Sequence, residues 1–242
     1  MSMLVGASVY ARAAMPLRLR RRARHFDVPV QDMLLRVTGP DELYEEARAV
    51  GMQFWEQIQS YAIRDPSFRS SKRPVSVPSD APPVVQQMAA LSARAGVGPM
   101  FTFRGALTES IGTAMSRSIP DVTVVCGPDH FIVPRRRARL PLEGHAGRNI
   151  ELGIVVKPEL GPQGLHIGSG PGVARSAGDS VIVVASSCIL ADAAAAGVTA
   201  ILGKPDSFHA ALAYLQRIDG IHGALLVRGD RIGMAGSLEL AA

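Results

Sequence analysis

Residues 180–202 read SVIVVASSCILADAAAAGVTAIL, and this stretch decides the fold. The run Val181–Val184 consists of four consecutive β-branched residues, which is typical of a strand buried on both faces. From about Ser187 to Leu202 the residues are small and apolar, which predicts a helix. Because Ala193–Ala196 have little side-chain bulk, this helix can pack closely on a sheet. The stretch therefore predicts a layered fold of helices and sheet.

The rest of the chain predicts an α+β fold in which antiparallel sheets pack against helices. The order of the elements lacks the regular alternation of strand and helix that a parallel sheet requires. Gly229-Asp230 lies between two strand-like runs and predicts a hairpin turn. Residues 66–83 are rich in proline and serine and predict a long ordered loop or a linker. Strands are expected at 17–24, 26–37, 122–126, 131–133, 150–156, 180–185, 224–227 and 231–240, and helices at 41–63, 82–95, 100–117, 187–202 and 205–218.

Composition excludes three classes of protein. The chain has 242 residues, 47% of them hydrophobic, and it is too apolar to be intrinsically disordered. No apolar run approaches the roughly 18 residues of a membrane span, so we expect no membrane partner. The two cysteines, Cys126 and Cys188, cannot form a disulfide framework, and they favour the cytoplasm. We expect residues 1–16 to be a flexible N-terminal extension and residues 17–242 to form a single domain.

The formal net charge of +5 comes from two short arginine patches. Without these nine residues the chain has 17 basic and 21 acidic residues, so its body is mildly acidic. Neither patch spreads over a face with aromatic residues for base stacking, so we do not expect nucleic-acid binding. Each arginine patch is either a solvent-exposed face or a contact for an anionic ligand, and both roles stay open. The patches are Arg18, Arg20, Arg21, Arg22 and Arg24, and Arg135, Arg136, Arg137 and Arg139.

Four segments carry the most distinctive motifs. They are Asp65–Phe68 followed by Ala95–Met100, the turn Cys126–Asp129, Ser169-Gly170 with Ser176–Asp179, and Leu190–Ala196. In this order and spacing they resemble the small uncharacterised protein family related to the ApbE flavin transferases. The resemblance covers about residues 25–240, and its most specific pieces are Val-Gly-Pro-Met and Ala-Asp-Ala-Ala-Ala.

The resemblance implies a T-fold-like ApbE-type architecture and, together with the apolar, alanine-rich helices, a homodimer. The order of the elements, a helix pair and then a strand pair in each half, indicates two quasi-equivalent halves. ApbE proteins are magnesium-dependent enzymes that bind FAD and move FMN onto a protein threonine. The implied ligand is therefore an anionic, phosphate-bearing small molecule, FAD or FMN, bound in a cleft, with Mg²⁺ at Asp192. The residues that the resemblance places at the cofactor are Gly98, Pro99, Met100, Gly127, Asp129, Gly168, Ser169 and Gly170.

Three of these positions also have structural interpretations. Asp192 lies near the start of a helix, where a carboxylate complements the macrodipole without any ligand. Asp129 is either a ligand contact or a turn-forming aspartate. Gly168–Gly170 is either an anion-binding nest or a plain glycine-rich loop.

The chain departs from the family pattern at several positions. ApbE proteins have a metal-binding threonine four residues after the aspartate, and this chain has Ala196 there. Pro128 removes one backbone donor from the turn that relatives build with Gly-Gly-Asp. His166 stands where many relatives have cysteine. These changes do not favour flavin transfer.

Two other hypotheses come from different functional classes. Some members of the small family are linked to sulfide assimilation into homocysteine, so Cys126 or Cys188 would be a sulfur carrier. Cys188 near a helix N-terminus fits a stabilised thiolate, but it also fits a buried small apolar residue. A non-catalytic oligomeric scaffold is favoured instead if Phe101 and Phe103 fill the cleft.

Overall fold

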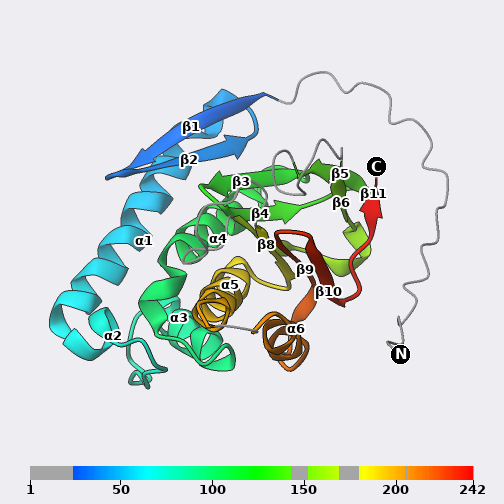
Figure 1. Ribbon diagram of the computed structural model, residues 1–242. Coiled ribbons are helices and arrows are strands. Elements are labelled where there is room, and N and C mark those ends of the chain that lie inside the picture. The colour runs from blue at the N-terminus through cyan, green and yellow to red at the C-terminus, as the bar shows by residue number, and fades with distance from the viewer. Residues whose placement is uncertain (1–23, 143–151, 169–179, 205–206, 242) are drawn as a thin grey trace, which may run out of the picture.

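The computed structural model describes residues 24–142, 152–168, 180–204 and 207–241 (Figure 1). The expected extension over residues 1–16 therefore lies outside the described residues. The elements in chain order are β1 (His25–Val30), β2 (Met33–Thr38), η1 (Asp41–Leu43), α1 (Tyr44–Arg64), α2 (Pro66–Ser70), α3 (Pro83–Arg94), η2 (Pro99–Thr102), α4 (Phe103–Met115), β3 (Val122–Cys126), β4 (Asp129–Val133), β5 (Ala138–Pro141), β6 (Gly153–Val156), η3 (Pro158–Leu160), β7 (Gln163–Gly168), β8 (Ser180–Ala185), α5 (Cys188–Leu202), α6 (Phe208–Gln216), β9 (Ile221–Arg228), β10 (Arg231–Gly236) and β11 (Leu240–Ala241).

The described strands form two antiparallel sheets. The large sheet has eight strands in the order β1-β2-β3-β4-β7-β8-β9-β10, and the small sheet has three in the order β11-β6-β5. Every neighbouring pair in both sheets is antiparallel. The α+β class predicted from the sequence is confirmed. The two quasi-equivalent halves and the T-fold description stay predictions.

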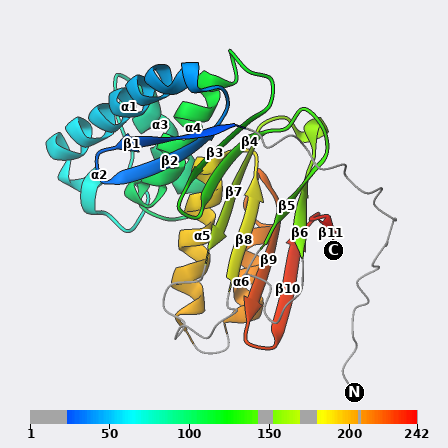
Figure 2. The same ribbon diagram turned by 90° about the horizontal axis from the view of Figure 1, so that it is seen from above.

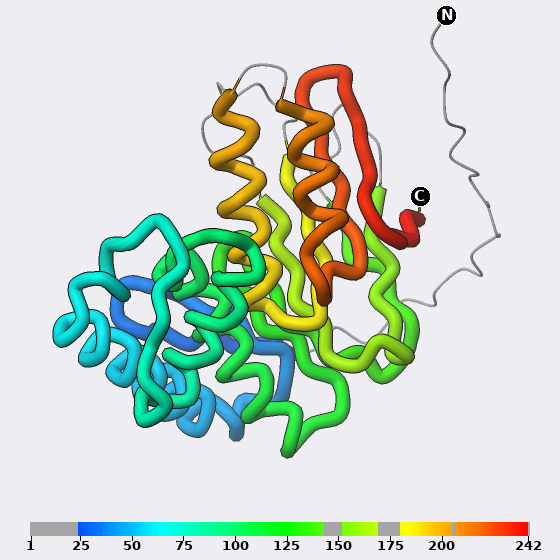
Figure 3. The backbone as a smooth tube through the Cα atoms, turned by 90° about the horizontal axis from the view of Figure 1, so that it is seen from below, coloured from blue at the N-terminus to red at the C-terminus, as the bar shows by residue number. Residues whose placement is uncertain are grey.

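Three apolar clusters hold the layers together. The first lies between the helix-facing side of β1–β3 and helices α1, α3 and α4. The second joins the same side of β8 and β9 to α5 and α6, which run side by side (Figures 2 and 3). The third lies on the opposite side of β4 and β7–β9, where the small sheet covers them. Residues that alternate along one strand therefore enter different cores.

The longest described helix, α1, confirms the expected helix at 41–63, with the short η1 turn before it. Its buried side chains include Ala47, Ile58 and Tyr61 at helical spacing, and its opposite face is charged. None of the helices in the described part of the chain has both the length and the apolar character that crossing a membrane needs.

Residues 26–37 form a hairpin instead of the single strand that was expected. Gln31 and Asp32 make the turn between β1 and β2, and Gln31 has a positive φ of 56°. The buried positions change from even numbers, Val28 and Val30, to odd numbers, Leu35 and Val37. That change of phase is what a reversal of the chain requires. The strand expected at 17–24 falls almost entirely outside the described residues.

Three further elements were not anticipated. The short helix α2 lies within the segment that was expected to be a loop, where Asp65 caps it by accepting hydrogen bonds from Ser67 N and Phe68 N. Strand β5 contains Arg139 of the second arginine patch, and β7 has a short apolar alternation of two residues, Leu165 and Ile167. Two apolar positions are too few to predict a strand, and the helix-facing positions of β7 are two glycines and a histidine.

Strand β8 and helix α5 confirm the elements expected in residues 180–202. Ser187 caps α5, its Oγ accepting from Leu190 N at 3.4 Å. Glu109 of α4 reaches the same helix end, where its Oε2 accepts from Ser187 Oγ at 2.7 Å, from Cys188 N at 2.7 Å and from Ile189 N at 3.2 Å. A carboxylate at this position satisfies donors that have no partner within the helix.

Glycines let α5 approach its neighbours at backbone distance. A Cβ on Gly164 of β7 would lie 2.0 Å from Cys188 N, and one on Gly105 of α4 would lie 2.6 Å from Cys188 O. At the other end of the helix, a Cβ on Gly197 would lie 1.9 Å from Tyr214 Oη of α6. The first turn of α5 is therefore fixed between β7 and α4.

We predict that Glu109→Ala lowers the free energy of unfolding by about 2 kcal/mol, because it leaves the Ser187 hydroxyl and two backbone N–H groups without their acceptor. Glu109→Gln keeps an accepting oxygen and should lose less. Chemical denaturation followed by circular dichroism measures both values. Glu56→Ala, at an exposed position of α1, is the control. An equal, small effect of Glu109→Ala and Glu56→Ala would contradict the capping role.

Candidate functional site

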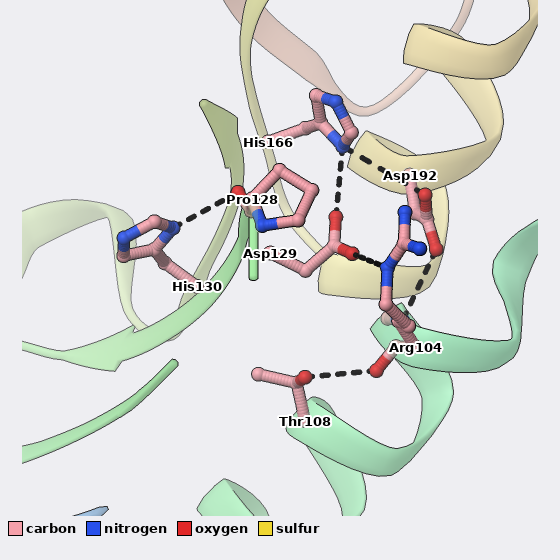
Figure 4. A network of polar contacts seen from close by, with 8 residues as sticks. Arg104, Thr108, Pro128, Asp129, His130, His166 and Asp192 are labelled. Carbon is pink, nitrogen blue, oxygen red and sulfur yellow. Dashed lines mark hydrogen bonds and ion pairs between the residues drawn. The ribbon is translucent and has the colours of Figure 1, made fainter. Parts of the chain in front are cut away.

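Four polar side chains from four different elements meet where α4 and α5 cover the large sheet (Figure 4). They are Arg104 of α4, Asp129 of β4, His166 of β7 and Asp192 of α5, and we call them the Asp-His cluster. The sequence separates these residues widely. Their convergence makes this place the candidate site.

Strand register places Asp129 opposite His166. The two residues are direct partners in the antiparallel pairing of β4 with β7, so their Cβ atoms lie on the same face of the sheet. Helices cover that face. Phe131, two residues after Asp129 and on the same face of β4, packs against Gly112 of α4, and Gly164 of β7 packs against Cys188 of α5. The cluster therefore lies under the helices, on the side away from the small sheet.

The turn between β3 and β4 delivers Asp129 to the start of its strand. Gly127 has φ of 57°, and the proline at 128 requires a negative φ, a sign pattern that is found in type II′ hairpin turns. The carbonyl of Pro128 accepts from Ile167 N at 2.7 Å and lies 3.0 Å from His130 Nδ1. Pro128 has no backbone N–H to donate, but its carbonyl oxygen accepts a hydrogen bond that joins the turn to β7.

Each carboxylate of the Asp-His cluster has one oxygen bound by α4 and the other turned toward His166. Asp129 Oδ2 accepts from Arg104 Nε at 3.0 Å, and Asp192 Oδ2 accepts from Gly105 N at 3.1 Å. Asp129 Oδ1 lies 2.8 Å from His166 Nδ1, which donates to it, whereas Asp192 Oδ1 lies 3.7 Å from the same nitrogen. The three atoms Asp129 Oδ1, Asp192 Oδ1 and His166 Nδ1 face one another.

Burial sets the electrostatics of the cluster. Asp129 is 0% exposed and Asp192 is 4% exposed. Burial, together with the negative charge of Asp129, raises the pKa of Asp192 to about 7. The two carboxylates therefore compete for a limited amount of positive charge.

The donor set of the cluster differs from the one that Mg²⁺ prefers. One ligand atom each from Asp129, His166 and Asp192 lies within 4.8 Å of the others, which is close enough to hold a metal ion. Mg²⁺ requires octahedral oxygen coordination, and one of these three donors is an imidazole nitrogen. Ala196, one turn along α5 from Asp192, has no oxygen in its side chain to add. The imidazole nitrogen therefore makes this donor set less suited to Mg²⁺ than a set of oxygens alone.

The structure brings together three of the residues expected from the sequence. Asp129 and Asp192 belong to the cluster, and Gly168 lies beside it, since a Cβ on Gly168 would be 2.7 Å from His166 Nε2. Asp129 is a strand residue with a buried, ion-paired carboxylate, so the turn-forming interpretation is wrong. Gly168 ends strand β7 and pairs with Val181, so it is not part of a loop. Ser169 and Gly170 lie outside the described residues.

The segment Gly98–Met100 has packing roles. A Cβ on Gly98 would lie 1.8 Å from Ser71 O, Pro99 is buried, and Met100 packs against the first apolar cluster. The segment leads into α4 only a few residues before Arg104. Contact of Gly98, Pro99, Met100 and Gly127 with a cofactor stays a prediction.

Sequence reasoning missed Arg104 as a site residue and left the role of His166 open. Arg104 lies in an unremarkable helix, and no motif distinguishes it from the other arginines. The signal that was present is Gly105, a glycine inside a predicted helix, which indicates a close approach of another backbone. The backbone that approaches Gly105 is that of Cys188 in α5, and beside it Gly105 N donates to Asp192 Oδ2.

The second arginine patch lies away from the cluster. Arg137 pairs with Glu239, and Arg139 Nε donates to Ala241 O at 3.3 Å. Both partners belong to the C-terminal segment, beside the small sheet. Since the small sheet covers the face opposite the helices, these two arginines secure the C-terminus rather than line the cluster.

Comparisons with known proteins identify the family of this chain and agree with its fold. A family model described as "AbpE bacteria" matches residues 15–216. A UPF0280 protein from Methanopyrus kandleri is 31% identical over 218 residues, covering 85% of this chain and 86% of its own. A UPF0280 protein from Methanocella arvoryzae is 28% identical over 194 residues, covering 75% and 76%. The apo crystal structure of the flavinyl transferase ApbE from Pseudomonas stutzeri shares the fold, with a TM-score of 0.56 at 14% identity over 88% of this chain and 93% of that one.

The two cysteines are free and buried. Burial raises the pKa of Cys126 to about 11, and burial also raises the pKa of Cys188 well above its usual value. The interpretation of Cys188 as a buried small apolar residue is confirmed, since its exposure is 0%.

We predict that both thiols of the folded protein react with iodoacetamide at least roughly tenfold more slowly than in the denatured chain at the same pH, because the thiolate is the reactive form. Mass spectrometry of tryptic peptides measures the two rates separately. A thiol that reacts equally fast in the folded and denatured protein would contradict its burial.

Proposed function

The chain belongs to the family described as "AbpE bacteria", and on this premise we propose that it binds a phosphate-bearing small molecule of the flavin type, FAD or FMN, beside the Asp-His cluster. The observation that carries the proposal is the convergence of Arg104, Asp129, His166 and Asp192 in one place. Polar and ionisable groups that converge from separate elements are typical of ligand sites.

Arg104 is the residue best suited to meet a phosphate. Its side chain is 48% exposed while Asp129, its partner, is fully buried, so the ion pair fixes the guanidinium at the edge of the cluster. The contact with Asp129 uses Nε–H, one of the five donors of a guanidinium. The planar fork of arginine binds phosphate oxygens in a bidentate manner.

The flavin class is supported by the fold shared with the Pseudomonas stutzeri flavinyl transferase. Flavin transfer itself is not part of the proposal. Ala196 provides no hydroxyl one turn after Asp192, and one of the three donors of the cluster is a nitrogen, which Mg²⁺ does not favour. Binding of the ligand is the function that the residues of this chain support.

The alternatives raised by the sequence have less support. A sulfur carrier needs an accessible thiolate, and both thiols are buried with raised pKa values. A scaffold would have Phe101 and Phe103 filling the site, but Phe101 is 46% exposed and Phe103 packs against the first apolar cluster.

We further propose that the protein works in the cytoplasm, where its two free thiols stay reduced. The single domain over residues 17–242 and the homodimer are retained as proposals that rest on the family resemblance.

We predict that the wild-type protein binds FAD or FMN and that Arg104→Ala weakens this binding about tenfold, the cost of losing a charge-assisted hydrogen bond. Arg104→Lys should retain part of the affinity, because the charge stays while the bidentate geometry is lost. Quenching of flavin fluorescence on titration with protein measures the dissociation constants.

Arg48→Ala, at an exposed position of α1, is the matched control and should bind flavin like the wild type. A thermal melt of each variant separates loss of binding from loss of fold. The proposal fails if neither flavin binds the folded wild-type protein, or if Arg104→Ala and Arg48→Ala bind equally well.

A further inference from the structure

The charge balance of the Asp-His cluster depends on a proton or a cation in addition to Arg104. Asp129 and Asp192 are both buried, and the guanidinium of Arg104 is the one permanent cation within the cluster. A carboxylate taken out of water needs a compensating charge. When both carboxylates are ionised and the imidazole is neutral, one negative charge is left over. Either a proton or a cation must fill this role.

The cluster is arranged to present ligand atoms to one point. Arg104 and the backbone N–H of Gly105 each hold one carboxylate oxygen, which orients the other oxygen of Asp129 and of Asp192 toward His166. Partners that hold the outer side of a ligand are typical of metal sites, where they fix the orientation of the ligand.

The imidazole of His166 is also held in place. A Cβ on Gly168 would lie 2.7 Å from Nε2 and 3.3 Å from Pro128 Cβ, so the ring fits against residues that leave no room for a larger side chain. Its other nitrogen, Nδ1, faces the two carboxylates at 2.8 Å and 3.7 Å. The His166 side chain is 12% exposed, whereas the two carboxylates beside it are buried.

We propose that Asp129 Oδ1, His166 Nδ1 and Asp192 Oδ1 form a binding site for one Zn²⁺ ion rather than for Mg²⁺. Zn²⁺ accepts imidazole and carboxylate together, with bonds of about 2.0–2.2 Å that place neighbouring ligand atoms of a tetrahedron about 3.4 Å apart. The two distances to Nδ1 fall on either side of this value. Zn²⁺ displaces the Nδ1 proton, and small side-chain movements complete the geometry.

Three protein ligands leave the fourth position of a tetrahedral zinc ion for a water or an oxygen of the ligand. A phosphate at this position would also meet Arg104, which lies on the other oxygen of Asp129. The zinc site rests on the proposed function and deepens it. Two buried carboxylates would repel a phosphate, and the positive charge of the zinc ion would offset this repulsion. The metal test needs no flavin, so each proposal can fail without the other.

The experiment titrates chelator-treated full-length protein with ZnCl₂ and, separately, with MgCl₂ in an isothermal calorimeter, without flavin. We expect one Zn²⁺ per chain, bound at least about tenfold more tightly than Mg²⁺. Titration with Co²⁺ provides a second readout, because the visible absorption of this ion reports whether nitrogen and oxygen ligands surround it with low coordination number.

Three variants locate the site. His166→Gln and Asp192→Asn each remove one ligand with little change of shape, and each should weaken Zn²⁺ binding at least about tenfold. Gly168→Ala keeps every ligand but pushes on Nε2, and it should weaken Zn²⁺ binding and alter the Co²⁺ spectrum. His25→Gln, at an exposed position of β1, is the control and should bind Zn²⁺ like the wild type.

The outcomes separate cleanly. Tight zinc binding that is lost in the ligand variants and kept in His25→Gln supports the site. Zinc binding of equal strength in all variants means that other residues hold the ion and overturns the proposal. Equal affinity for Zn²⁺ and Mg²⁺, or no zinc binding by the folded wild type, overturns it as well. Circular dichroism identifies any variant that does not fold, and the remaining variants then decide.

Discussion

The approach of the first turn of α5 to strand β7 is the contact on which the rest of the structure depends. It is possible because Gly164 has no side chain, since a Cβ there would overlap the backbone of Cys188. Glu109 accepts hydrogen bonds from the first backbone N–H groups of α5, so the helix can begin against the sheet without leaving these donors unpaired. One turn further, Asp192 is carried to the face of the sheet where Asp129 and His166 lie. The same contact that closes the core therefore builds the site.

The chemistry of the site follows from charge that is buried under these constraints. The helices exclude water from two carboxylates, and the raised pKa of Asp192 is one consequence of this. Arg104 offsets one charge and orients Asp129. A zinc ion and a phosphate-bearing ligand together would complete the balance, the ion facing the carboxylates and the phosphate facing the ion and Arg104. The proposed function and the proposed metal thus address one electrostatic requirement.

Much of the fold was predictable because its elements have strong local signals. The β-branched run and the alanine-rich helix of residues 180–202 fix β8 and α5, and apolar spacing fixes α1. Strand β7 was missed because its apolar alternation is limited to Leu165 and Ile167, and its helix-facing positions are Gly164, His166 and Gly168. The β1–β2 hairpin was missed because Gln31-Asp32 is a weak turn signal, and only the change of phase in the buried residues reveals it.

The sequence by itself determined the class of fold and the family resemblance, and it singled out Asp129, Gly168 and Asp192 as candidates, because these inferences depend on residue types and their local spacing. Only the tertiary structure decided that His166 faces both carboxylates and that Arg104 belongs with them. The reason is physical: strand register sets which residues are cross-strand neighbours, and register is fixed by packing between elements far apart in the chain. No local pattern around His166 or Arg104 encodes that pairing. The sequence named possible ligands, and packing selected the point where they meet.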